Sequence, residues 1–132
     1  MRSFYTQFYR IVDFLEWHSK NLLELVPDFQ RESGWSLLAK SSLIDKILRG
    51  KPIHSMSIRQ EINGSRTKKI LIDGKQRLTT IIEFTNDKFA LSDTQDKELV
   101  GKFFSTLTED LQKKILRYKL FVFRFNGPAI PF

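Results

Sequence analysis

The polar segment from Asp73 to Thr80 has the clearest chemical potential in this sequence. It follows the apolar run Lys69 to Ile72 and precedes a stretch with helical spacing, so a strand, a tight turn and a helix start are expected at one point. The start of a helix exposes unpaired backbone N–H groups and a partial positive charge, which attract anions. Gly74 would let a ligand approach the backbone closely, and Lys75 and Arg77 add charge that complements phosphate. The segment therefore predicts a phosphate-binding turn.

Other side chains of this segment extend the prediction toward catalysis. Asp73 could hold a divalent cation such as Mg²⁺ or act as a base, and Gln76 could orient a water molecule or donate a hydrogen bond to a phosphate oxygen. Thr79 and Thr80 are further candidate nucleotide contacts. The same spacing also fits a structural arrangement in which Asp73 caps the helix, Arg77 forms a surface pair and the threonines pack. Spacing alone leaves both interpretations open.

Two helices are expected on either side of this segment in the chain. Apolar residues recur at three- and four-residue spacing from Ser36 to Leu48, and Gly50 followed by Pro52 is a strong stop signal. The helix that follows the turn keeps its apolar spacing until about Asn86.

A basic hairpin is expected just before the turn. Strands are predicted over His54 to Ile62 and Lys69 to Ile72, with a hairpin turn at Asn63-Gly64. Its candidate DNA contacts are Arg59, Arg66, Lys68 and Lys69. The alternative is a solvated edge that uses lysine to block strand pairing.

Shorter elements complete a mixed pattern of helices and strands. They are a helix over Ile11 to Trp17 with Asp13 as its cap, an extended segment over Leu22 to Leu25, a short strand over Phe89 to Leu91, a helix from the cap Thr108 to about Arg117, and a strand over Lys119 to Phe125. Phe121, Phe123 and Phe125 would share one face of the last strand, and we expect that face in the core. The pattern predicts an α+β fold.

Composition narrows the class of protein. A chain of 132 residues is expected to form one domain, residues 1–132. The absence of cysteine excludes disulfides and thiolate metal sites and makes the cytoplasm the default compartment. No stretch reaches the roughly 20 apolar residues of a membrane span. The net charge of +7 favours polyanionic partners such as DNA or nucleotides, although it also serves solubility.

Three separated motifs together resemble the N-terminal domain of GmrSD-type, modification-dependent restriction enzymes. The motifs are Pro27 to Arg31 followed by Trp35, Leu43 to Ile53, and Ile72 to Thr80. They occur in the order of that family, and the resemblance extends over about Ile11 to Phe125.

The resemblance implies a ParB- and sulfiredoxin-like fold, a small sheet packed with short helices, in which an Asp-Gly-Gln-Gln-Arg signature supports nucleotide binding and, in several members, nucleoside triphosphate hydrolysis linked to DNA cleavage. The matching positions are Asp73, Gly74, Lys75, Gln76 and Arg77. Asp73, Gln76 and Arg77 are accordingly the candidate catalytic residues. Lys75 replaces the first glutamine of the signature, so phosphate binding is expected to survive while hydrolysis is in doubt.

A second family motif falls on Phe29, Gln30 and Arg31. We expect Gln30 and Arg31 beside the turn, either contacting phosphate or forming a structural hydrogen-bond bracket.

Two activities of related proteins are not expected here. Family members that cut DNA carry a C-terminal nuclease domain of His-metal type, whereas His18 and His54 form no cluster with metal-ligand spacing, so we predict no metal site and a nuclease on a separate subunit. Sulfiredoxin chemistry needs a cysteine, and there is none. The alternative to a nucleotide-binding sensor, possibly a nucleoside triphosphatase, is a non-enzymatic module that binds DNA or a protein. The sequence leaves the oligomeric state open.

Overall fold

The computed structural model describes residues 3–25 and 34–126. The chain divides into two compact units. Unit 1 comprises Met1–Phe29, His54–Lys75 and Lys119–Phe132, and unit 2 comprises Gln30–Ile53 and Gln76–Tyr118.

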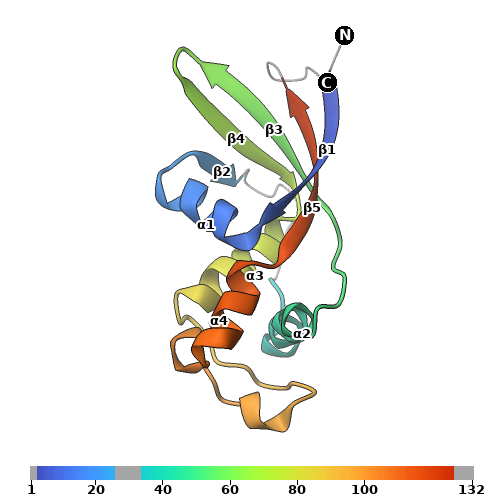
Figure 1. Ribbon diagram of the computed structural model, residues 1–132, viewed down its shortest axis with the longest axis vertical. Helices are drawn as coiled ribbons and strands as arrows, with labels where there is room; N and C mark the ends of the chain where they lie inside the picture. The colour runs from blue at the N-terminus through green and yellow to red at the C-terminus, as the bar shows by residue number, and fades with distance from the viewer. Residues whose placement is uncertain (1–2, 26–33, 127–132) are drawn as a thin grey trace. The chain divides into compact units, whose positions relative to one another are not determined.

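Unit 1 is built on a five-stranded mixed sheet (Figure 1). Its strands are β1 (Ser3–Arg10), β2 (Leu23–Leu25), β3 (Met56–Asn63), β4 (Arg66–Asp73) and β5 (Lys119–Asn126), in the spatial order β1-β5-β3-β4-β2. The pairs β1–β5 and β3–β4 are antiparallel, whereas β3–β5 and β2–β4 are parallel. The predicted α+β class is confirmed, and the extended segment near Leu22 to Leu25 is β2.

Helix α1 (Ile11–Ser19) packs against β1 and β2. It begins where predicted, but Asp13 lies inside its first turn, where the carboxylate accepts a hydrogen bond from the Arg10 backbone N–H at 2.8 Å. Asp13 therefore holds the residue before the helix, rather than occupying the cap position itself. Ile11 and Phe14 are fully buried and form part of the core of unit 1.

The β3–β4 hairpin turns one residue later than predicted. Asn63 and Arg66 form the last pair of the ladder, so the two turn residues are Gly64 and Ser65. Gly64 has φ +64°, the left-handed conformation that a two-residue hairpin turn requires and that glycine adopts without steric cost. The hairpin itself is confirmed.

The phenylalanines of β5 share one face, as expected, but it is not the fully buried one. Leu120 and Val122, on the opposite face, are buried, whereas Phe121 is 37% exposed. Phe121 instead makes an edge contact with Phe8 of the neighbouring β1, with ring centroids 5.2 Å apart. The prediction that this face is core was wrong because alternation specifies two faces without specifying which one the helices cover.

Unit 2 is helical. It contains α2 (Leu37–Leu48), most of α3 (Lys75–Thr85), α4 (Glu109–Leu116) and the short 3₁₀ helices η1 (Lys97–Leu99) and η2 (Phe104–Thr106). Ser36 and Thr108 cap α2 and α4, accepting hydrogen bonds from the backbone N–H groups of Ala39 and Leu111. Helices α2 and α4 pack together, and the buried residues of the unit include Ile44, Ile47, Leu78, Ile81, Phe84 and Ile115.

The strand predicted over Phe89 to Leu91 does not form. Leu91 exchanges backbone hydrogen bonds with the Gly101–Lys102 segment, at 2.7 and 2.9 Å, but the pairing involves this residue alone. Its side chain is 1% exposed. The apolar run therefore reflects burial of a loop rather than a ladder.

Candidate functional site

The segment from Asp73 to Arg77 has the predicted strand-turn-helix geometry. Strand β4 ends at Asp73, Gly74 forms the turn, and α3 begins at Lys75 (Figure 1). The second segment of unit 1 ends at Lys75 and the second segment of unit 2 begins at Gln76, so the chain passes from one unit to the other here. The first backbone N–H groups of α3 have no partner within the helix, which makes its beginning a potential anion site.

Gly74 holds a backbone conformation that other residues rarely adopt. Its φ is +107°, and a Cβ atom built on it would lie 2.8 Å from Cγ and 3.3 Å from Cβ of the fully buried Met56. The position directly before α3 therefore excludes a side chain for two reasons, strain and contact with Met56. Glycine has no side chain that could bond to the first N–H groups of the helix, so Gly74 does not itself cap them.

The two side chains that flank Gly74 are accessible to different degrees. Asp73 is exposed and Lys75 is half-buried. None of the ion pairs between described residues includes either of them. Asp73 lies two residues before the helix, with Gly74 in the cap position, so the simple structural interpretation of Asp73 as the cap residue does not describe this turn.

The remaining residues of the segment lie in the first turns of α3. Gln76, Arg77 and Thr79 are half-buried, and both Gln76 and Arg77 interact with other groups of the protein. Thr80 is only 1% exposed, and its hydroxyl donates a hydrogen bond to the Gln76 carbonyl at 2.8 Å. That hydroxyl is engaged within its own helix, and the predicted nucleotide contact of Thr80 stays a prediction. Gln30 and Arg31 lie outside the described residues.

The predicted DNA-contacting residues of the hairpin are on different faces of the sheet. Arg59 forms an ion pair with Glu61 at 3.1 Å, and Lys68 forms one with Glu24 at 2.7 Å. Lys69, the next residue of β4, points to the other face, where its ammonium lies over the Trp17 ring. Arg66 is exposed beside the hairpin turn. The four residues therefore do not form one basic surface.

The alternative prediction, a solvated sheet edge protected by lysine, applies to only part of β4. Strand β2 pairs with Lys69–Leu71, so that part is internal to the sheet. Among the described residues, no strand pairs with the other side of Arg66 to Lys68, and that part is an edge.

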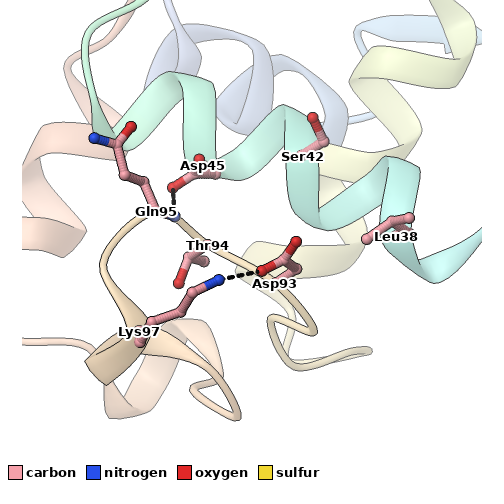
Figure 2. Close-up of a pocket in the computed structure, with 7 residues that line it drawn as sticks. All are labelled: Leu38, Ser42, Asp45, Asp93, Thr94, Gln95 and Lys97. Atoms are coloured by element: carbon pink, nitrogen blue, oxygen red, sulfur yellow. Dashed lines mark hydrogen bonds and ion pairs between the residues drawn. The ribbon is translucent and has the colours of Figure 1, made fainter.

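A polar hollow of about 270 Å³ lies in unit 2 between α2 and the segment before η1 (Figure 2). It is lined by Leu38, Ser42, Asp45, Asp93, Thr94, Gln95 and Lys97. Asp93 pairs with Lys97 at 2.9 Å, and the hydrogen bond and charge of Lys97 lower the pKa of the Asp93 carboxyl. Sequence spacing did not point to these residues, because they come together only through packing.

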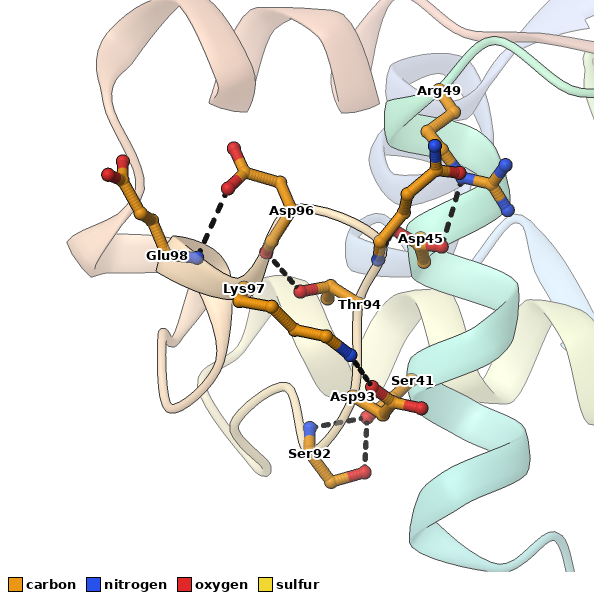
Figure 3. A network of polar contacts seen from close by, with 10 residues as sticks. Ser41, Asp45, Arg49, Ser92, Asp93, Thr94, Asp96, Lys97 and Glu98 are labelled. Carbon is orange, nitrogen blue, oxygen red and sulfur yellow. Dashed lines mark hydrogen bonds and ion pairs between the residues drawn. The ribbon is translucent and has the colours of Figure 1, made fainter.

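Polar contacts beside the hollow hold the loop to α2 (Figure 3). The Ser41 hydroxyl oxygen is 2.8 Å from the Ser92 backbone nitrogen and 3.0 Å from its hydroxyl. The Asp45 carboxylate accepts hydrogen bonds from Arg49 Nε at 3.0 Å and from the Gln95 backbone N–H at 3.3 Å. These contacts explain why two polar side chains are buried on α2, and they indicate a structural role.

Replacing Ser41 tests that structural role. Ser41 is 0% exposed, and Ser41→Ala leaves the Ser92 N–H without its acceptor, so we expect a loss of about 1–3 kcal/mol in the free energy of unfolding. The neighbouring Ser42 is exposed, and Ser42→Ala should stay within about 0.5 kcal/mol. Urea denaturation of the two variants measures the difference. Equal stabilities would show that the Ser41–Ser92 contact does not hold the loop.

Comparison with known proteins assigns the chain to a family. Unit 1 and unit 2 together form an α+β protein with a strand-glycine-helix turn suited to anions. Residues 12–126 match the family described as the GmrSD restriction endonuclease, N-terminal domain. The match covers most of the chain, and the chain belongs to this family, which makes it a component of a restriction system. No curated protein and no solved structure matches.

Within residues 3–25 and 34–126, no helix is both long and apolar enough to cross a membrane. The same residues contain no group of three or more His, Cys, Asp or Glu side chains arranged to hold a metal ion.

Proposed function

We propose that the domain binds a nucleoside triphosphate, with a phosphate group at the turn from Asp73 to Arg77, and acts as a nucleotide sensor in a restriction system. The observation that carries this proposal is Gly74, whose conformation and contact with Met56 exclude a side chain at the position directly before α3. An anion at this position would accept hydrogen bonds from the first N–H groups of α3.

The charges at the turn support a phosphate ligand. Lys75 begins α3, and Arg77 follows two residues later, so two cations belong to the first turn of the helix. Lysine provides a compact charge and arginine a planar set of donors, and both are common phosphate partners. Asp73, at the exposed end of β4, is suited to a Mg²⁺ ion that accompanies the nucleotide.

Hydrolysis is a separate step, and Lys75 is the residue that bears on it. The Asp-Gly-Gln-Gln-Arg signature that this segment resembles has glutamine where this chain has Lys75. An ammonium has no carbonyl oxygen to accept a hydrogen bond from an attacking water, whereas a glutamine side chain does. We infer that this chain retains nucleotide binding and that its hydrolysis is weakened. Asp73 and Gln76 are the residues that would act on water.

A titration separates binding from turnover. Each of the four nucleoside triphosphates is titrated into the protein with Mg²⁺ by calorimetry, and phosphate release is then followed at saturating nucleotide. Binding with phosphate release identifies a nucleoside triphosphatase. Binding without release identifies a non-enzymatic sensor, and absence of binding to all four nucleotides contradicts the proposal.

Restoring glutamine should increase turnover. We expect Lys75→Gln to raise the rate of phosphate release by up to roughly 10²-fold, the lower range for a group that assists proton transfer. Nucleotide affinity should stay similar or fall slightly, because water orientation acts mainly in the transition state. Steady-state assays of both proteins at saturating nucleotide measure the effect. If the native protein already hydrolyses as fast as the variant, Lys75 has no influence on the chemistry.

A further inference from the structure

A second group of basic and aromatic side chains lies in unit 1, on the face of the sheet that carries α1. We call it the Lys69–Arg124 cluster. Its members are Tyr5, Gln7, Tyr9, Trp17, Lys69 and Arg124.

Each of the two cations lies over an aromatic ring. The Lys69 ammonium is 4.3 Å from the centre of the Trp17 ring, and the Arg124 guanidinium carbon is 5.2 Å from the centre of the Tyr5 ring. Such contacts hold a cation while leaving its N–H groups available for an acceptor on the other side. They orient the two charges without neutralising them.

The Arg124 side chain is further held by β1. Its Nη1 donates hydrogen bonds to the Tyr9 hydroxyl at 2.9 Å and to Gln7 Oε1 at 3.3 Å, and the Tyr9 hydroxyl donates to the same Gln7 oxygen at 3.1 Å. Both partners are neutral. The Arg124 Nε atom is buried and has no hydrogen-bond partner among the described residues.

The strand register places Lys69 and Arg124 on the same face of the sheet, on the two strands that flank β3. Arg124 pairs with Ile58 of β3, and Lys69 pairs with Gln60, two residues farther along the same strand. Strands are spaced about 4.8 Å apart, so the two Cα atoms are separated by roughly 12 Å across β3. Both side chains are long enough to reach one ligand between them.

Within residues 3–25 and 34–126, no carboxylate pairs with either of these two charges. The ion pairs between described residues include neither Lys69 nor Arg124. On the opposite face, by contrast, Arg59 and Lys68 are each paired with a glutamate. Among the described residues, Arg59 and Lys68 therefore have carboxylate partners, whereas Lys69 and Arg124 have none.

This arrangement is unfavourable without an anion. Burial, followed by the charge of Arg124, lowers the pKa of the Lys69 ammonium. An anion between the two side chains would stabilise both charges and raise that pKa.

A nucleic-acid phosphate matches the chemistry and the setting of the cluster. The β3–β4 hairpin and the strands β1 and β5 extend past α1 (Figure 1), and Tyr5 is 45% exposed. Phosphate oxygens accept hydrogen bonds from lysine and arginine. The net charge of +7 draws polyanions to the protein.

We propose that Lys69 and Arg124 bind one backbone phosphate of DNA on the α1 face of the sheet. The contact is independent of nucleotide binding at the turn from Asp73 to Arg77. It assigns to Lys69 a role that its neighbour Lys68 does not share.

A matched pair of variants tests the assignment. Lys69→Met and Lys68→Met each remove one charge from β4, at adjacent positions on opposite faces. We expect Lys69→Met to weaken binding of a short DNA duplex about tenfold at 50 mM salt and to reduce the slope of log affinity against log salt by about 1. Lys68→Met should change the affinity less than about twofold, because Lys68 is already paired with Glu24.

Two arms of the same titration identify the ligand and the site. Lys69→Arg should keep most of the affinity, and triphosphate binding measured by calorimetry should be the same in Lys69→Met and the native protein. Equal losses in Lys68→Met and Lys69→Met, or no loss in either, would overturn the proposal. So would inorganic phosphate that competes with the duplex at equal concentration, because a free anion would then be the ligand.

A measurement on the native protein covers the case in which Lys69→Met does not fold. The ammonium of Lys69 is titrated by NMR with and without the duplex, and we expect DNA to raise the pKa of Lys69. Inorganic phosphate at the same concentration should leave this pKa where it is. An unchanged pKa in the presence of saturating DNA would contradict direct contact with a phosphate.

Discussion

Gly74→Ala should lower the free energy of unfolding by roughly 2–5 kcal/mol, the sum of backbone strain and overpacking at a buried position. The strain arises because alanine rarely adopts φ +107°, and the overpacking arises because the new methyl group would meet Met56 Cγ at 2.8 Å. Urea denaturation measures the change as a shift in midpoint at constant slope. Triphosphate binding should also weaken, because any adjustment of the turn displaces the first N–H groups of α3.

Gly64→Ala is the matched control for this effect. Gly64 also has positive φ, +64°, but a Cβ atom there has nothing within 4 Å. We expect this variant to lose only about 1–2 kcal/mol from left-handed strain. The difference between the two alanine variants combines the contact with Met56 and the greater backbone strain at φ +107°.

A double-mutant cycle examines the same contact directly. In a Met56→Ala background the Cγ atom is gone, so Gly74→Ala should cost less than in the native protein. Identical costs in the two backgrounds would assign the whole effect to backbone conformation. A Gly74→Ala protein as stable as the native one would show that the turn adopts another conformation.

Arg77→Ala should weaken triphosphate binding by about 1.5–3 kcal/mol, the range for hydrogen bonds to charged groups, which corresponds to roughly 10- to 150-fold in the dissociation constant. Arg77 belongs to the first turn of α3, two residues after Lys75, and its guanidinium can make paired contacts with phosphate. Calorimetry with the nucleotide that binds most tightly measures the change.

Two controls make the Arg77 result specific. Arg117→Ala removes an exposed arginine of unit 2 that lies at the end of α4 and should leave the affinity unchanged. Arg77→Ala also removes internal contacts, so its unfolding curve is compared with that of the native protein. A stable Arg77→Ala protein with native affinity would exclude this side chain from the nucleotide site.

The local structure around the candidate turn followed closely from neighbouring residues. An apolar run, a glycine and a helical repeat led to β4, the turn at Gly74 and α3. Thr108 likewise proved to be the cap of α4, and the helix expected from Ser36 begins at Leu37 with Ser36 as its cap. These features depend on backbone geometry over a few residues, where propensity and capping act strongly.

Patterns that admit more than one partner were harder to interpret. The apolar run at Leu91 suggested a strand, but only one residue pairs there and the segment is a buried loop. The hairpin turn was expected at Asn63-Gly64 and lies at Gly64-Ser65. A register shift of one residue costs little locally, and the pairing of the whole ladder decides between the alternatives.

The sequence alone was enough to establish the α+β class, the family resemblance and the strand-turn-helix segment, because each is encoded in consecutive residues or in the order of motifs. Tertiary structure decided which faces are buried. It also determined that β2 pairs with part of β4 and that Lys68 and Lys69 have different partners. It also brought Arg124 close enough to Lys69 to lower its pKa, although 54 residues separate them in the chain (124 − 69 − 1). The physical reason is that a strand offers two equivalent faces until long-range pairing and helix packing select the one that is buried.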